Sequence, residues 1–469
     1  MTLQTSWPTV TPARAHTRRT LTRAGLSVAA AAGALALGAC GAGAGTAPAK
    51  KERTAPATVR FMALGSGTAM QWQLQQFEKF NQTVGAAQKI VVAPEPESDQ
   101  TKLFEKFQAT SAAASAPDVT RLKEVWVFES AAKGALAKLD GYFKTDKEFK
   151  ADDLLPRFQD SMKYKGSHYA VANALSLTIP FFNKSLAQAA GLDPNKPPTN
   201  YDEFREWARR MTKPGADAAT SQWGFDWYEY GTREIIMNQF LGFVRRFGGQ
   251  FWNRDRTAVA INGQAGYDVM DYLVTLIQKD RSTVPPDAGV PSPWSAGRTT
   301  GKVGMWETTT TGVPNYPRQN PDLSFGVFLW PKKPNNNQNL AAGSSAVAAN
   351  SKDLDATWEF VKWWNAPEQQ MGFYNEAGGN APSRKSLFEA PPFTTDPLWK
   401  IVMPGFNDKD GRTRPLAERY NELAEAMTPH LMDAFRGKVA PKIAVDNAAQ
   451  AGTAFWKSIG GNADKAGPE

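Results

Sequence analysis

The sequence is poor in the residues that make covalent cross-links and metal sites. It contains one cysteine, Cys40, and three histidines in 469 residues. A single cysteine cannot form a disulfide within the chain. Only His168 and His430 lie beyond Cys40, whereas a zinc site of the His/Cys type needs three or four such ligands. We therefore predict no metal and no other cofactor.

Negative charge is missing from the N-terminal segment. No acidic residue precedes Cys40, whereas arginine occurs four times there, at Arg14, Arg18, Arg19 and Arg23. An uncharged run over residues 24–39 follows and ends at the cysteine. A basic segment, an apolar run and small residues at a processing site are typical of a secretory signal. The run is shorter than the roughly 20 residues that span a membrane.

The residues around the cysteine resemble a known processing motif. LGAC (37–40) resembles the lipobox of bacterial lipoproteins, which implies that Cys40 carries lipid and begins the mature chain. TRRTLTR (17–23) resembles a twin-arginine export signal, with the general secretory route as the alternative. We expect residues 1–39 to be a lipoprotein signal peptide and residues 40–57 a flexible tether. The protein would then be extracytoplasmic and anchored to the cell membrane.

The charge of the remaining chain is close to balanced. Removing residues 1–39 takes away four of 54 basic residues and none of 46 acidic ones, which leaves 50 − 46 = +4. No Lys/Arg-rich run of five to eight residues occurs, which argues against nucleic acid as a partner. The length corresponds to about two or three domains.

Apolar periodicity predicts alternating strands and helices. A strand over 59–64 precedes a helix that begins near Met70, and a strand over 89–93 precedes a helix over 101–114 and a strand over 118–122. Further helices are expected over 201–211, 233–247, 265–279 and around 356–364, and further strands over 303–306 and 325–329. This alternation favours an α/β architecture with a largely parallel sheet.

Eight short motifs then occur in a recognisable order. They are APDV (116–119), GALAKLD (134–140), KGSHYAV (165–171), FFNK (181–184), AGLD (190–193), PTNYDEF (198–204), GKVGMW (301–306) and NAPSR (380–384). In this order the chain resembles the extracellular solute-binding proteins of family 1, which feed sugars to ATP-binding-cassette (ABC) importers. It departs from the family at Phe182, where tyrosine is usual, and at Ala172-Asn173, where a proline is replaced.

The resemblance implies a fold and a set of partners. The fold would be α/β and of the two-lobed, type II periplasmic-binding-protein kind, with lobes that close about a hinge of crossing strands. The N-terminal lobe would comprise residues 58–172 and 303–341, and the C-terminal lobe residues 173–302 and 342–469. The protein would be a monomer and no enzyme, and its partners would be a small-molecule sugar and ABC permease subunits in the membrane.

A sugar site needs aromatic platforms beside several hydrogen-bonding groups. Ligands of open parallel sheets bind outside the carboxyl ends of the strands, so the segments that follow predicted strands supply the candidates. The candidate ligand-binding residues are Ser66, Glu124, Trp126, Asn173, Trp227, Tyr228, Trp306, Glu307, Asn380 and Arg384. The choice of Trp306 and Glu307 also follows the family resemblance.

Several candidates have a structural alternative. Ser66 lies in a Gly-Ser-Gly-Thr segment that could simply be a turn before a helix. Trp126 and the aromatic cluster over 226–230 could be core, and Arg384 could form a surface ion pair.

Two other functions remain open at this point. One is binding of a different solute, such as glycerol phosphate, a peptide or a polyamine. The other is an exported glycoside hydrolase, which would need two carboxylates about 5–10 Å apart. No motif for a nucleophile or a metal occurs, which argues against catalysis.

Overall fold

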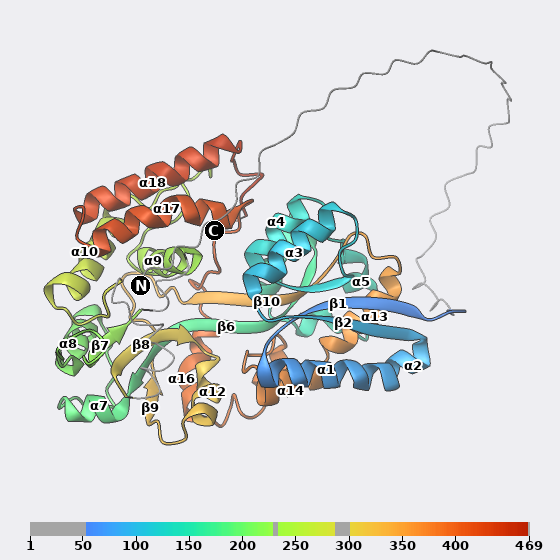
Figure 1. The fold of residues 1–469 in the computed structure, drawn as a ribbon, viewed down its shortest axis with the longest axis horizontal. Coiled ribbons are helices and arrows are strands. Elements are labelled where there is room, and N and C mark those ends of the chain that lie inside the picture. Colours follow the sequence, from blue (N-terminus) through green and yellow to red (C-terminus); the bar gives the residue numbers. More distant parts are fainter. Residues whose placement is uncertain (1–52, 228–232, 287–300, 468–469) are drawn as a thin grey trace, which may run out of the picture. The chain divides into compact units, whose positions relative to one another are not determined.

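The computed structural model describes residues 53–227, 233–286 and 301–467 (Figure 1). Most strands belong to one sheet of eight strands in the order β2-β1-β3-β10-β6-β8-β7, with β9 paired to β6. The strands are β1 (Ala57–Leu64), β2 (Ile90–Glu97), β3 (Val119–Lys123), β6 (Ala170–Asn183), β7 (Trp223–Asp226), β8 (Val303–Thr309), β9 (Phe325–Val327) and β10 (Asn339–Val347). A separate hairpin joins β4 (Lys163–Tyr164) to β5 (Ser167–His168).

The sheet is mixed, so the expectation of a largely parallel sheet is wrong. Parallel pairing occurs between β1 and β2, between β1 and β3, and between β7 and β8. Between these parallel groups run β6 and β10, which pair antiparallel with each other and with their other neighbours in the sheet. Periodicity identifies strands but does not give their direction, which here is set by the two central strands.

The two central strands connect the parallel groups. The first part of β6 pairs with β10, and its last part pairs with β8 and β9. β10 in turn pairs with β3. The predicted lobe boundaries near residues 172 and 341 therefore fall within β6 and β10, which Figure 1 shows running side by side.

Helices cover both groups of strands. The helices over the first third of the chain are α1 (Gly67–Gln82), α2 (Val84–Gln88), α3 (Gln100–Ala112), α4 (Glu124–Ala132), α5 (Asp140–Thr145), η1 (Ala151–Asp153) and α6 (Pro156–Asp160). Those of the middle are α7 (Lys184–Ala189), α8 (Tyr201–Met211), α9 (Arg233–Arg246), α10 (Gln264–Val274), η2 (Thr275–Lys279) and α12 (Gly312–Gln319). The last are α13 (Leu354–Trp364), α14 (Pro367–Gly372), η3 (Phe373–Ala377), α15 (Lys385–Phe388), α16 (Pro397–Phe406), α17 (Tyr420–Phe435) and α18 (Pro441–Ser458).

Side chains of β1 alternate between two buried clusters, because successive residues of a strand point to opposite faces. Phe61 joins an aromatic cluster with Phe77 of α1 and with Phe360 and Trp364 of α13. Met62 belongs to the larger cluster, which extends beneath α3, α4, α8, α9 and α17. The sheet is thus covered on both faces, as an α/β architecture requires.

Local sequence signals fix some helix ends well. α8 has the predicted bounds, and the side chain of its N-cap residue Asn200 accepts a hydrogen bond from the backbone N–H of Glu203. In contrast, α17 and α18, which pack against each other, were not predicted.

Arg53, inside the predicted tether, forms an ion pair with Asp353. Across the described ranges, no helix is both long and apolar enough to cross a membrane.

Close packing of β7 against α8 predicts a sharp cost for one added methyl group. A Cβ at Gly224 would lie 1.7 Å from the carbonyl oxygen of Ala208, so Gly224→Ala should lower the free energy of unfolding by about 1–3 kcal/mol or more. Gly141→Ala is the control, since a Cβ in α5 would meet no atom within 4 Å and should stabilise slightly. Urea unfolding measures both; equal effects would contradict the packing described.

Candidate functional site

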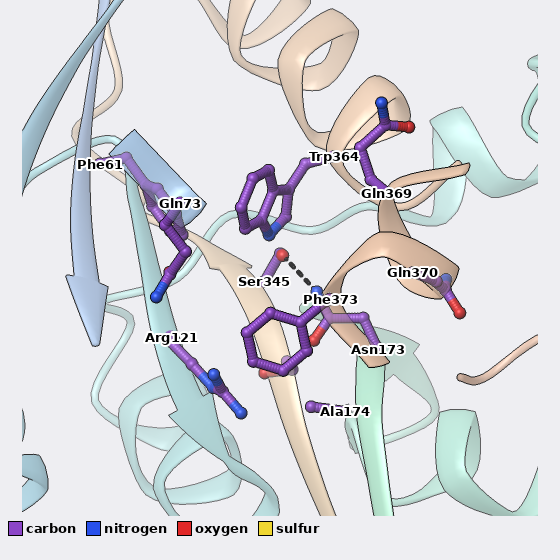
Figure 2. A pocket seen from close by; sticks show the side chains of 11 residues that line it. Phe61, Gln73, Arg121, Asn173, Ala174, Ser345, Trp364, Gln369, Gln370 and Phe373 are labelled. Carbon is purple, nitrogen blue, oxygen red and sulfur yellow. Dashed lines mark hydrogen bonds between the residues drawn. The ribbon is translucent and has the colours of Figure 1, made fainter. Parts of the chain in front are cut away.

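A small pocket lies over the paired strands β6 and β10, beside the carboxyl ends of β1 and β3. Its volume is about 30 Å³, room for about two water molecules where one needs roughly 10–15 Å³. The residues that line it are Phe61, Gln73, Arg121, Asn173, Ala174, Ser344, Ser345, Trp364, Gln369, Gln370 and Phe373 (Figure 2).

The pairing of β6 with β10 shapes the floor of the pocket. The register shifts between Gly343 and Ser344, which is a bulge that redirects the neighbouring side chains. On this floor the side-chain amide of Asn173 donates a hydrogen bond to the Ser345 hydroxyl oxygen at 2.8 Å. Gly343 leaves space for Arg121, since a Cβ there would lie 3.2 Å from Arg121 Nε.

Aromatic rings from α13 and η3 form one wall. Trp364 and Phe373 both pack against Trp72 of α1, with ring centroids 5.8 and 5.7 Å apart. Gln73, the next residue of α1, donates from its side chain to the carbonyl oxygen of Leu64, the last residue of β1, at 2.9 Å. The pocket therefore adjoins the carboxyl edge of the parallel strands, where ligands of such sheets bind.

Arg121 is the charged residue of the pocket. Its Nη2 donates to Asn380 Oδ1 at 3.4 Å, and its guanidinium carbon lies 5.2 Å from the centre of the Phe373 ring. Among the residues that the structure describes, no carboxylate lies within ion-pair distance of it. Burial without a counter-ion lowers the pKa of Arg121 to about 10.

A buried ion cluster lies next to the pocket, at the end of β3. Lys123 Nζ lies 3.0 Å from a carboxylate oxygen of Glu234 in α9, and Arg414 lies 2.8 Å from Glu124 at the start of α4. Arg414 also pairs with Glu234. Glu124 accepts a further hydrogen bond from the backbone N–H of Ala342 in β10. The cluster joins β3, α4, α9 and the segment before α17.

The charges within the cluster set the protonation of Glu234. Burial raises the pKa of a carboxyl group, but Arg414 and Lys123 outweigh that effect and lower the pKa of Glu234 to about 2. Burial also lowers the pKa of Arg414, and the two glutamates more than reverse that shift. Each cation is therefore matched by an anion, which buried ion pairs require.

Comparison with known proteins identifies the family. Residues 74–401 match the model of the bacterial extracellular solute-binding protein family. The chain belongs to that family. Its members are binding proteins, and an extracellular family places this protein outside the cytoplasm.

Individual proteins resemble this chain in sequence or in fold. A maltotriose-binding protein of Pyrococcus abyssi is 22% identical over 71% of this chain and 70% of its own length. The solved structure of an ABC substrate-binding protein of Listeria monocytogenes in complex with cycloalternan has a TM-score of 0.73 at 18% identity, over 86% of this chain and 99% of that one. A binding protein of Mycobacterium tuberculosis in complex with glycerophosphocholine has a TM-score of 0.69 at 18% identity, over 87% and 100%. The predicted two-lobed fold is confirmed.

Three predicted residues lie at or beside the pocket and the cluster. Asn173 lines the pocket, and Asn380 contacts Arg121. Glu124 lies in the ion cluster rather than facing solvent. Ser66 is exposed at the N-cap of α1, without a side-chain capping bond, and does not line the pocket.

The predicted tryptophans are packed within the solute-binding fold. Trp126 stacks on Phe104 with ring centroids 4.4 Å apart, and the Nε1–H of Trp306 donates to the Tyr316 hydroxyl. Trp227 stacks on Phe243. All three side chains are at most 2% exposed, so none presents a ring face to a solute in this conformation.

The remaining predicted residues are bonded to other protein groups or lie outside the described ranges. Glu307 is buried and accepts hydrogen bonds from Trp330 Nε1 and Gln239 Nε2. Arg384 is 3% exposed, donates to the carbonyl oxygens of Asn365 and Phe149 and forms an ion pair with Asp153 at 3.5 Å, and it does not line the pocket. Tyr228 and Cys40 lie outside the described residues. The ligand-binding role of the candidates stays a prediction.

Arg121 and Lys123 are not among the candidate residues, although the sequence contains a signal for them. Both interrupt the apolar strand that includes Val119 and Leu122, and they are two residues apart. Residues at that spacing share one face of a strand. The partners Glu234 and Arg414 could not have been found, because nothing in the sequence brings them to β3. Within the described ranges, no group of three His, Cys, Asp or Glu residues could hold a metal ion.

The ion cluster predicts a specific acid sensitivity. The folded pKa of Glu234, about 2, lies below its ordinary value of 4.5. Its ionised form therefore stabilises the fold above pH 4.5, and this contribution, about 3 kcal/mol at 1.36 kcal/mol per pKa unit, is lost as the pH falls toward 2. Glu234→Gln should cost about 3–5 kcal/mol at pH 7 and lose less stability on acidification.

Urea unfolding from pH 7 to pH 3 measures this effect. Glu105→Gln, an exposed glutamate of α3, is the control and should follow the parent protein at every pH. If Glu234→Gln and the parent lose stability in parallel between pH 5 and pH 3, the cluster does not hold Glu234 ionised in the way described.

Proposed function

We propose that this protein is the substrate-binding subunit of an ABC importer that captures a mono- or oligosaccharide between its lobes and delivers it to membrane permease subunits. The observation that carries the proposal is the family match over residues 74–401. The fold agrees with it, because β6 and β10 join two groups of strands in one sheet. The named relatives include a maltotriose-binding protein and one in complex with cycloalternan.

The chemistry of the pocket supports a polar, ring-bearing solute. Amide side chains of Gln73 and Asn173 can both donate and accept hydrogen bonds. Trp364 and Phe373 supply aromatic surface beside them. This pairing suits the hydroxyls and the apolar C–H faces of a sugar.

The alternative of a non-sugar solute has one specific observation in its favour, which is the relative in complex with glycerophosphocholine. The glycoside hydrolase alternative is weaker. Glu124 and Glu307, the two glutamates among the candidate residues, are buried and bonded to protein groups, so neither is positioned to act on a glycosidic bond.

Thermal unfolding of the purified protein with a panel of solutes tests the proposal. A saccharide at 100 times its Kd should add about 2.7 kcal/mol of stability and raise the midpoint accordingly. Glycerol 3-phosphate, short peptides and polyamines form the comparison arms, and a chromogenic glycoside tests for turnover. A rise with a phosphorylated or peptidic solute and with no saccharide would sink the sugar assignment.

We also propose that lipid on Cys40 anchors the protein to the outer face of the cell membrane, where residues 41–57 would tether it near its permease as a monomer. The lipobox-like LGAC at 37–40 and the basic, acid-free segment before it support this. An anchor of this kind raises the local concentration of the binding protein at the transporter.

Replacing the cysteine tests the anchor. Cys40→Ser should move the protein from the membrane fraction to the soluble fraction and abolish incorporation of labelled fatty acid, because no other cysteine exists. Ala39→Gly keeps a small residue at the processing site and should remain in the membrane fraction. If Cys40→Ser stays membrane-bound after a high-salt wash, the anchor is not this lipid.

A further inference from the structure

Arg121 carries a positive charge into the pocket that no described carboxylate neutralises. Its contacts are one amide oxygen, Asn380 Oδ1 at 3.4 Å, and the Phe373 ring. Lys123, two residues further along the same face of β3, pairs with Glu234 at 3.0 Å. Of the two cations on this strand, Lys123 thus has a carboxylate partner, whereas Arg121 lines the pocket without a described one.

Two further hydrogen-bond donors face the same space. The Ser345 hydroxyl oxygen accepts from the side-chain amides of Asn173 and Asn365, at 2.8 and 3.4 Å, which leaves its hydrogen to be donated. The indole nitrogen of Trp364 points toward the pocket in Figure 2. Among the described residues, neither this N–H nor the Ser345 hydroxyl donates to a protein acceptor. A pocket that presents a cation and spare donors favours an anionic group.

The size of the pocket restricts which anion fits. Its volume of about 30 Å³ is of the order of two water molecules, which suits a group of a few atoms such as a carboxylate at the base of the pocket. A guanidinium donates two parallel hydrogen bonds to a carboxylate, and such charge-assisted bonds are about twice as strong as neutral ones.

Resting on the proposed function, we propose that this pocket receives the carboxylate of the solute, so that the ligand is an acidic sugar whose ring lies outside the pocket at the carboxyl ends of β1 and β3. Arg121 binds the carboxylate, while Ser345 and Trp364 donate to it. The assignment concerns Arg121, which did not appear among the candidates drawn from the sequence.

Matched pairs of sugars test this inference by isothermal titration calorimetry with the purified protein. The pairs are glucose with glucuronate, galactose with galacturonate, and maltose with maltobionate, and glucose 6-phosphate is the phosphate arm. In at least one pair the acid should bind about 10- to 100-fold more tightly than its neutral partner, the worth of one charged hydrogen-bonded pair.

Three variants test whether Arg121 causes the preference for the acidic sugar. Arg121→Gln should abolish the preference, so that the acid binds no more tightly than its neutral partner. Arg121→Lys should keep part of the preference. Lys102→Gln, which removes an exposed positive charge on α3, is the matched control and should bind as the parent does.

A second readout is made on the parent protein, and a variant is used only to assign the signal. The Arg121 Nε–H resonance, assigned by its loss in Arg121→Lys, should shift when the preferred acid is added and stay in place with the neutral partner. A neutral sugar that binds as tightly as its acid, a preference that survives Arg121→Gln, or a stronger preference for glucose 6-phosphate would overturn the carboxylate assignment and leave the sugar-binding function intact. Failure of every sugar, with binding of a peptide or a polyamine, would overturn both.

Discussion

The antiparallel pairing of β6 with β10 is the constraint on which the rest of the structure depends. These strands provide the hydrogen bonds that join β1, β2 and β3 to β7, β8 and β9 in one sheet. Because they pass through both groups, a movement of one group against the other must bend or twist the same two strands. Hinge motions of two-lobed proteins are concentrated in a few such residues. The bulge after Gly343 interrupts the ladder within this pair and places Asn173 and Ser345 on the floor of the pocket.

The ion cluster adds a second link across the same junction. Lys123 is the last residue of β3 and Glu124 is the first residue of α4. Glu234 comes from α9, and Arg414 from the segment before α17. Opposite charges in a region of low dielectric attract strongly, and separating them exposes each to a large desolvation cost. The cluster therefore favours the arrangement of elements that the structure shows. Any opening between these elements would have to rehydrate all four groups.

How far the sequence predicts this structure differs from element to element. Alternating or helical periodicity identified β1, α3 and α8, since each has one clear apolar face. The expectation of a parallel sheet failed because β6, from Ala170 to Asn183, is buried almost throughout and has no alternation from which a partner or direction can be inferred. Asn173, which lines the pocket, was among the candidates because it follows a family motif. Trp126 and Trp306 were chosen for their position after strands, but a side chain of that size gains most by complete burial.

The position of Arg121 could not be interpreted from sequence alone, because the feature that distinguishes it is the lack of a described carboxylate within ion-pair distance. A cation removed from water loses several kcal/mol of hydration unless a counter-ion replaces it. The chain supplies such counter-ions elsewhere, to Lys123 and to Arg414. At Arg121 it supplies an amide oxygen and an aromatic ring instead. The same low dielectric that makes an unneutralised charge unfavourable strengthens its attraction to an anion that arrives later. The cation is therefore best satisfied by a group that the protein does not itself contain.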